Sequence, residues 1–126
     1  MEEIMEMTAQ YTGVFDVGRA LSSVGGDREF LAELVGLTQA AWPTLLTNIQ
    51  AGLNRGDLCA VEATARLAKA AARNISAERA YESALRLEAM ARKGDFTAAQ
   101  SARVDLEREV EVLRFCLAGS ETMCPA

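Results

Sequence analysis

The chain contains no histidine, and this absence limits the chemistry that it can perform. Without an imidazole there is no histidine general base, no histidine metal ligand and no histidine-activated nucleophile. The sequence also lacks a Walker-type glycine loop and a Glu-x-x-His pair of the kind that builds di-iron sites. We therefore expect a protein that is not an enzyme, with no catalytic residue, no metal and no cofactor.

Cysteines and long apolar runs are also scarce. The three cysteines, Cys59, Cys116 and Cys124, match no CxxC or zinc-ligand pattern, so we expect reduced thiols that act as small apolar side chains. No apolar run approaches the roughly 18 residues that cross a bilayer. The acidic start, residues 1–7, lacks the basic flank and apolar segment of a signal peptide. These features predict a soluble, cytoplasmic protein.

Positive charge is in the minority, with 13 Lys and Arg against 18 Asp and Glu and a formal net charge of −5. An acidic surface attracts phosphate backbones and anionic lipids poorly. We therefore expect neither a nucleic-acid partner nor a membrane partner.

Aromatic residues make up only 6% of the chain although half of its residues are hydrophobic, so alanine and leucine must supply most of the core. This composition favours packing of helix on helix over a sandwich of β-sheets. A length of 126 residues suits a single domain. We expect one domain over 1–126, with a core at about 14–118 and tails at 1–12 and 119–126.

Apolar residues recur at spacings of three and four, which predicts amphipathic helices. A brief helix follows the capping residue Asp16, and long helices are expected at about 27–53, 58–74, 76–93 and 96–117. The inner face of the first long helix is predicted to carry Phe30, Leu31, Leu34, Thr38, Trp42, Leu45, Ile49 and Leu53. Pro43 lies inside this helix, and one bent helix is preferred over a break at Trp42.

Short stop-and-cap signals separate the predicted helices. Gly56-Asp57 and Gly94-Asp95 each combine a helix terminator with a good N-cap residue, and Ser76 is predicted to cap the helix that follows it. Helices joined by so few residues must pack as antiparallel neighbours. The predicted fold is all-α, an up-down antiparallel four-helix bundle with a short additional N-terminal helix.

One helix carries a charged row beside its row of small alanines. Glu62, Arg66, Lys69 and Arg73 follow one another at spacings of four, three and four, which places them on one side of the helix. Two interpretations remain open for this row. It is either a solvated face with a Glu62–Arg66 pair, or a patch that meets carboxylates or a phosphoryl group on a partner.

Several segments in order resemble the histidine-containing phosphotransfer (HPt) domains of two-component phosphorelay signalling. The similarity covers roughly residues 14–117. It is carried by Phe15-Asp16, Val24-Gly25-Gly26-Asp27-Arg28-Glu29-Phe30-Leu31-Ala32-Glu33-Leu34, Gly56-Asp57-Leu58, the segment from Ala65 to Arg79, Leu87-Glu88 and Lys93-Gly94-Asp95. The resemblance implies a helical bundle that binds the receiver domain of a response regulator or a hybrid kinase.

The chain departs from the active motif of this family, which reads roughly Ala-His-x-Leu-Lys-Gly. Alignment on the segment 74–77 places Lys69 on the motif lysine and Arg66 on the phosphoacceptor histidine. Ala68 and Ala70 then replace the motif leucine and glycine. A guanidinium is permanently protonated and has no lone pair for attack on an aspartyl phosphate. We therefore expect a pseudo-HPt domain, unable to accept or donate a phosphoryl group.

The resemblance also implies where a receiver domain docks. The expected surface consists of Glu62, Arg66, Leu67, Lys69, Ala70 and Arg73. Leu67 has the alternative of packing against the N-terminal segment.

A structural or oligomerisation module with no phosphorelay role is the alternative function. The last helix has apolar residues outside its main inward face, namely Val104, Val112, Phe115 and Cys116. These side chains could cover the N-terminal segment or form a homodimer.

Overall fold

The computed structural model describes residues 13–120, and no strand occurs in that range. Its helices are α2 (Val17–Ser23), α3 (Arg28–Asn54), α4 (Leu58–Asn74), α5 (Glu78–Arg92) and α6 (Phe96–Ser120). The all-α class predicted from the sequence is confirmed. The last helix continues past the predicted end at 117, while the predicted tail 1–12 and the end of the chain with Cys124 lie outside the described residues.

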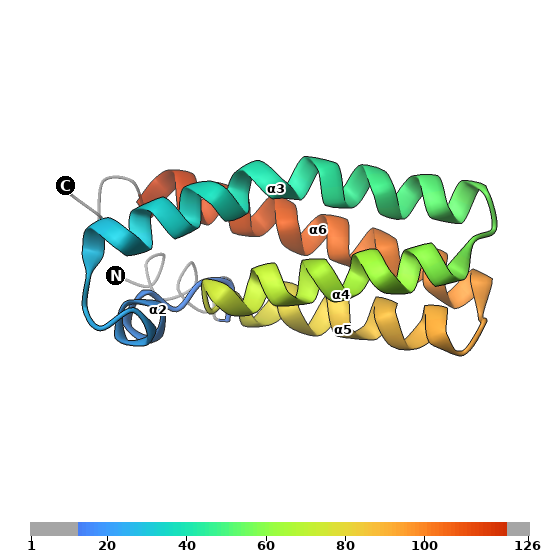
Figure 1. Cartoon of the computed structure of the whole chain (residues 1–126), viewed down its shortest axis with the longest axis horizontal. Helices are drawn as coiled ribbons and strands as arrows, with labels where there is room; N and C mark the ends of the chain where they lie inside the picture. The colour runs from blue at the N-terminus through green and yellow to red at the C-terminus, as the bar shows by residue number, and fades with distance from the viewer. Residues whose placement is uncertain (1–12, 121–126) are drawn as a thin grey trace, which may run out of the picture.

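The four long helices lie lengthwise beside one another, and the chain reverses direction at each short turn between them (Figure 1). Contacts join α3 to α4, α4 to α5, α5 to α6 and α3 to α6, so the helices enclose one shared core. The short helix α2 packs at the end of the bundle where α3 begins.

Aspartate side chains start most of these helices. In α2, α3, α4 and α6 the carboxylate of an aspartate accepts a hydrogen bond from a backbone N–H of the first turn, over distances of 3.0 to 3.1 Å. The four capping residues are Asp16, Asp27, Asp57 and Asp95. Each cap satisfies a donor that the helix itself cannot pair.

The turn between α4 and α5 departs from this pattern and corrects one prediction. Ser76 is not the N-cap of α5. It has a positive φ of 56°, and the N-cap is Ala77, which provides no side-chain hydrogen bond. The backbone hydrogen bonds explain the exchange, because the Ser76 and Ala77 amides bond back to Arg73 and Ala72 as the Gly56 and Asp57 amides bond back to Leu53 and Gly52. Ser76 thus occupies the left-handed position that glycine usually takes at a helix end.

Helix α3 runs without interruption through Pro43, as preferred from the sequence. Most of its predicted inner residues are buried, but Phe30 is 51% exposed and does not belong to the core. Phe30 lies in the first turn of α3, whose start extends past the end of α4 in Figure 1. A helical period therefore gives the position of this side chain on the helix, but not whether a neighbouring element covers it.

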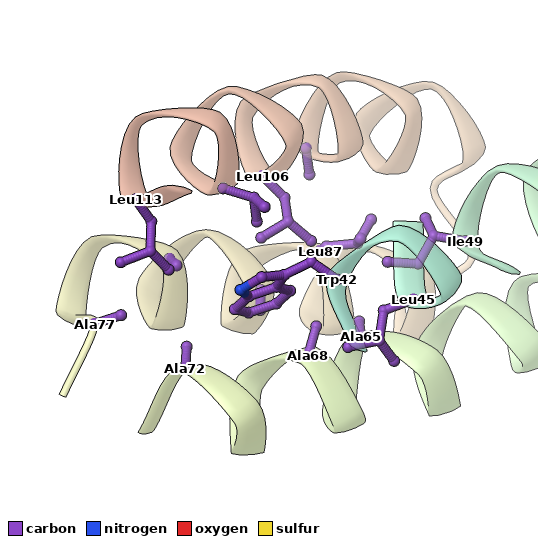
Figure 2. Close-up of a cluster of buried hydrophobic side chains, with 14 of the residues drawn as sticks. Trp42, Leu45, Ile49, Ala65, Ala68, Ala72, Ala77, Leu87, Leu106 and Leu113 are labelled. Atoms are coloured by element: carbon purple, nitrogen blue, oxygen red, sulfur yellow. The ribbon is translucent and has the colours of Figure 1, made fainter. Parts of the chain in front are cut away.

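Trp42 fills the centre of the bundle. Its indole is fully buried and lies over the small side chains of α4, with Leu87, Leu106 and Leu113 around it (Figure 2). The alanines of α4 leave the room that this large ring needs. Near the other end of α3, a Cβ on Gly52 would lie 2.9 Å from Cγ2 of Val61, so α3 and α4 approach too closely there for a larger residue.

Candidate functional site

A buried glutamate organises the charged face of α4 and α5. The Glu88 side chain is only 3% exposed, although it carries a carboxylate. Its Oε1 accepts a hydrogen bond of 2.8 Å from Lys69 Nζ, and its Oε2 accepts one of 3.0 Å from Arg66 Nε. A buried carboxylate requires such partners, because removal from water is costly for an unpaired charge.

Two further residues extend these contacts into a network. Arg92 donates from Nε to Glu62 Oε2 at 2.9 Å, and its Nη2 lies 3.4 Å from Glu88 Oε2. Arg66 Nη2 lies 3.5 Å from Glu62 Oε2. The Glu88 network, as we call it, therefore contains three cations, Arg66, Lys69 and Arg92, and two carboxylates, Glu62 and Glu88. One positive charge remains in excess.

The network holds Glu88 in its charged form. The hydrogen bond from Lys69 is the largest influence and lowers the pKa of Glu88, and the Arg66 hydrogen bond and the charges of Lys69 and Arg92 act in the same direction. Burial opposes them by raising the pKa, but the net direction is downward. The carboxylate is thus a permanent anion near neutral pH.

Three of the α4–α5 contacts follow a simple rule of position, whereas Lys69–Glu88 does not. Glu62 pairs with Arg92, and Arg66 pairs with Glu88; each pair is equidistant in sequence from Ala77, the N-cap of α5. Arg73 and Tyr81, which are also in contact, obey the same rule. This is the relation expected of two antiparallel helices that pack side by side across a short turn.

The surface above the buried carboxylate is both basic and apolar. The Arg66 side chain is 59% exposed, and its neighbour Leu67 is 61% exposed. Ala70, one turn further along α4, is exposed as well and keeps the helix surface low. A partner that approaches this surface would therefore contact the guanidinium of Arg66 and the side chain of Leu67. The small side chain of Ala70 would let it come close to the helix.

The structure brings together only part of the predicted charged row. Glu62, Arg66 and Lys69 join the Glu88 network, whereas Arg73 turns to Tyr81 and donates from Nη2 to its hydroxyl at 3.3 Å. The Arg73 guanidinium carbon also lies 5.3 Å from the centre of the Tyr81 ring, a cation–π distance. The charged row on α4 therefore makes contacts at two separate places on α5.

Sequence reasoning missed the α5 residues of the site. Glu88, Arg92 and Tyr81 all contact α4. No role was predicted for any of them, although Glu88 lies in one of the segments that carry the family resemblance. The missed signal was the complementary charge at positions symmetric about the α4–α5 turn. The Glu62–Arg66 pair of the first interpretation is present, and the second interpretation, a patch that meets a partner, stays a prediction.

Among the apolar residues considered on α6, Val112 and Cys116 pack against the core, while Val104 and Phe115 are exposed. Burial raises the pKa of the Cys116 thiol, although the charge of Arg79 acts against this effect. Within residues 13–120 no group of three or more aspartate, glutamate and cysteine side chains is placed to hold a metal ion. No helix in this range is long and apolar enough to cross a membrane.

The chain matches no protein-family model, no curated protein and no solved structure at a significant level.

Proposed function

We propose that the protein is a pseudo-HPt adaptor of phosphorelay signalling, which binds a receiver domain of a response regulator or hybrid kinase and carries no phosphate. The observation that carries the proposal is the exposed Arg66, which is paired with the buried Glu88 and followed in the chain by the exposed Leu67. The resemblance aligns Arg66 with the phosphoacceptor histidine. The proposal keeps the cytoplasmic location expected from the sequence.

The chemistry of this position supports binding without transfer. Arg66 cannot act as a nucleophile, because its guanidinium stays protonated, and the sequence offers no histidine elsewhere. Its planar fork can still hold a carboxylate or a phosphoryl oxygen in two hydrogen bonds. Only Nε of Arg66 is committed to Glu88, and its Nη2 lies at the longer distance of 3.5 Å from Glu62.

Charge complementarity supports an acidic partner. The Glu88 network has one positive charge in excess on a chain whose formal net charge is −5. The acidic cleft of a receiver domain would meet this local excess, while the rest of the surface would disfavour other orientations. Leu67 would supply apolar contact area at the same place.

Binding to purified receiver domains from the same genome tests the proposal. Isothermal titration calorimetry would use each receiver in its free form and in its beryllofluoride-activated form. We expect binding to at least one receiver, weakened about tenfold or more by Arg66→Glu, which reverses the charge at the centre of the surface. Arg55→Glu is the matched control, because Arg55 has a similar exposure, 61%, and lies in the α3–α4 turn, outside the Glu88 network. Absence of binding to every receiver at high micromolar concentration would refute the proposal.

A homodimer is the second candidate, and one observation favours it. Phe30 and Leu37 lie two turns apart on α3, and Leu37 is 71% exposed, the highest exposure among the large apolar residues of the described range. Multi-angle light scattering would decide between the two functions. A dimer whose mass falls to that of the monomer in Leu37→Glu favours the structural role, and a monomer at all concentrations removes it.

A further inference from the structure

A cavity of about 340 Å³ opens where α2 meets the α4–α5 turn, away from the Glu88 network. Its charged and hydroxyl-bearing lining residues are Arg19 and Ser23 of α2, Arg73 of α4, Ser76 of the turn, and Glu78 and Tyr81 of α5. The volume lies within the range of pockets that hold small organic ligands.

Two of the lining residues, Arg19 and Arg73, are arginines. Within the described residues neither Arg19 nor Arg73 forms an ion pair, whereas Arg66 and Arg92 each contact two carboxylates. Arg73 is instead held by the ring and hydroxyl of Tyr81, at 5.3 Å and 3.3 Å. Within the described residues its guanidinium therefore contacts a tyrosine and no carboxylate.

The hydrogen-bond donors of the lining suit an anion with several oxygens. The two arginines supply planar forks, and Ser76 and Tyr81 supply hydroxyl groups, while the Ser23 hydroxyl donates to the carbonyl of Ala20 at 2.7 Å. A carboxylate has only two oxygens to share among these groups, whereas a phosphate monoester presents three. The start of α5 adds a favourable field, since Ala77 provides no capping side chain there.

Among the described residues of the lining, Glu78 is the acidic one, and its charge should lower the affinity of the cavity for anions. Its carboxylate opposes any anion in the cavity, so its neutralisation should strengthen binding. Opposite effects of neighbouring substitutions are difficult to produce by general disruption of the fold.

We propose that this cavity binds a small molecule that carries a phosphate monoester, held mainly by Arg73 and Arg19. The inference uses none of the residues of the Glu88 network, although Arg73 also belongs to the receiver-binding surface expected from the sequence. The apolar walls near Tyr81 would accept the organic part of such a ligand.

Titration of the labelled protein with inorganic phosphate, glycerol 3-phosphate and acetate, followed by amide chemical shifts, tests the proposal. We expect saturable shifts at 19–23 and 73–81, with glycerol 3-phosphate binding more tightly than phosphate and acetate more weakly than both. Arg73→Gln should weaken binding about tenfold, and Arg19→Gln should weaken it in the same direction.

Two variants complete the design. Glu78→Gln should tighten binding a few-fold, and Arg55→Gln should leave it unchanged, because Arg55 lies in the α3–α4 turn and does not line the cavity. Amide spectra without ligand verify that each variant is folded. Shifts scattered over the bundle, or equal affinities of the parent, Arg73→Gln and Glu78→Gln, would overturn the proposal.

Discussion

Lys69 Nζ lies 2.8 Å from Glu88 Oε1, so a lysine of α4 holds a glutamate of α5 that is 3% exposed. This contact joins the two helices at the centre of the candidate site. It also explains why a basic row can lie on the flank of an acidic protein, because a buried carboxylate lies beneath it. The structure and the proposed binding surface therefore depend on the same residue.

Replacement of this carboxylate tests its structural part. Glu88→Gln keeps the shape but removes the charge that pairs with Lys69 and Arg66, so we expect the free energy of unfolding at pH 7 to fall by about 1–3 kcal/mol. Urea denaturation measures this loss. In Glu107→Gln the carboxylate is 48% exposed and pairs with Arg103 within the same helix, so the expected change is below about 0.5 kcal/mol. Equal effects of the two variants would show that burial adds nothing to the Glu88 contacts.

The lowered pKa of Glu88 predicts how its contribution varies with pH. A carboxyl whose folded-state pKa lies below its unfolded value, about 4.3, stabilises the fold above that value. The contribution is lost as the pH falls through the lower folded-state pKa. The stability difference between the parent and Glu88→Gln should therefore be constant from neutral pH to about pH 5 and shrink in more acidic solution. A difference that grows on acidification would contradict the direction of the shift.

Two glycines of α3 should respond to alanine in opposite directions. In Gly52→Ala the new Cβ would meet Cγ2 of Val61 at 2.9 Å, and we expect a loss of about 1–3 kcal/mol from this overpacking. Gly36 has nothing within 4 Å of the same position, so Gly36→Ala should add about 0.5–1 kcal/mol through helix propensity alone. Thermal unfolding of both variants checks the pair. If Gly52→Ala stabilised the protein as well, the close approach of α3 and α4 would be wrong.

Ser76 should be more stable as glycine. A φ of 56° is unfavourable for a residue with a Cβ, and glycine occupies the equivalent turn positions Gly56 and Gly94, whose φ values of 70° and 77° are also positive. Ser76→Gly should therefore raise the free energy of unfolding by about 0.5–1 kcal/mol, with Gly94→Ser losing a similar amount. Denaturant unfolding of the two reciprocal variants measures both changes. Destabilisation by Ser76→Gly would mean that the serine hydroxyl makes a contribution larger than the strain.

Phosphoryl acceptance should be absent in the parent and depend on Glu88 in a histidine variant. The parent should show no acid-labile phosphoryl group after incubation with a phosphorylated receiver. In Arg66→His the carboxylate of Glu88 would lie close to the imidazole and raise its pKa, which disfavours the neutral nucleophile. The double variant with Glu88→Gln should accept more phosphate than Arg66→His alone, as measured by phosphorylation before and after acid treatment. The reverse order would show that Glu88 assists the imidazole.

Helix periodicity, caps and turn signals predicted the all-α class, and α4 was placed at its observed residues because Asp57 and the alanine row mark it clearly. The predicted start of α5 was wrong because serine is a good N-cap by residue type. In the structure Ser76 instead adopts the positive φ that glycine usually has at a helix end, and Ala77 is the N-cap. Local preference and the hydrogen bonds of the preceding helix compete there, and the sequence does not state which prevails.

The site was only half predicted, for a different physical reason. The α4 row follows from the period of a single helix, but the choice of Glu88 as partner needs the register between two helices. That register is set by the α4–α5 turn. Because the role of Ser76 in this turn was predicted wrongly, the pairing of Arg66 with Glu88 and of Arg73 with Tyr81 could not be predicted either. The prediction that Phe30 lies on the inner face failed for a similar reason. Whether the start of α3 is covered depends on how the helices pack, which the period of one helix does not determine.

The most direct test of the central claim is amide chemical-shift mapping of the labelled protein during titration with a receiver domain. The account predicts that the largest shifts cluster on α4 and α5, at residues 62–70 and 88–92, and that Arg66→Glu removes them. Shifts centred on the exposed residues of α3 or α6, such as Leu37 or Val104, would contradict it.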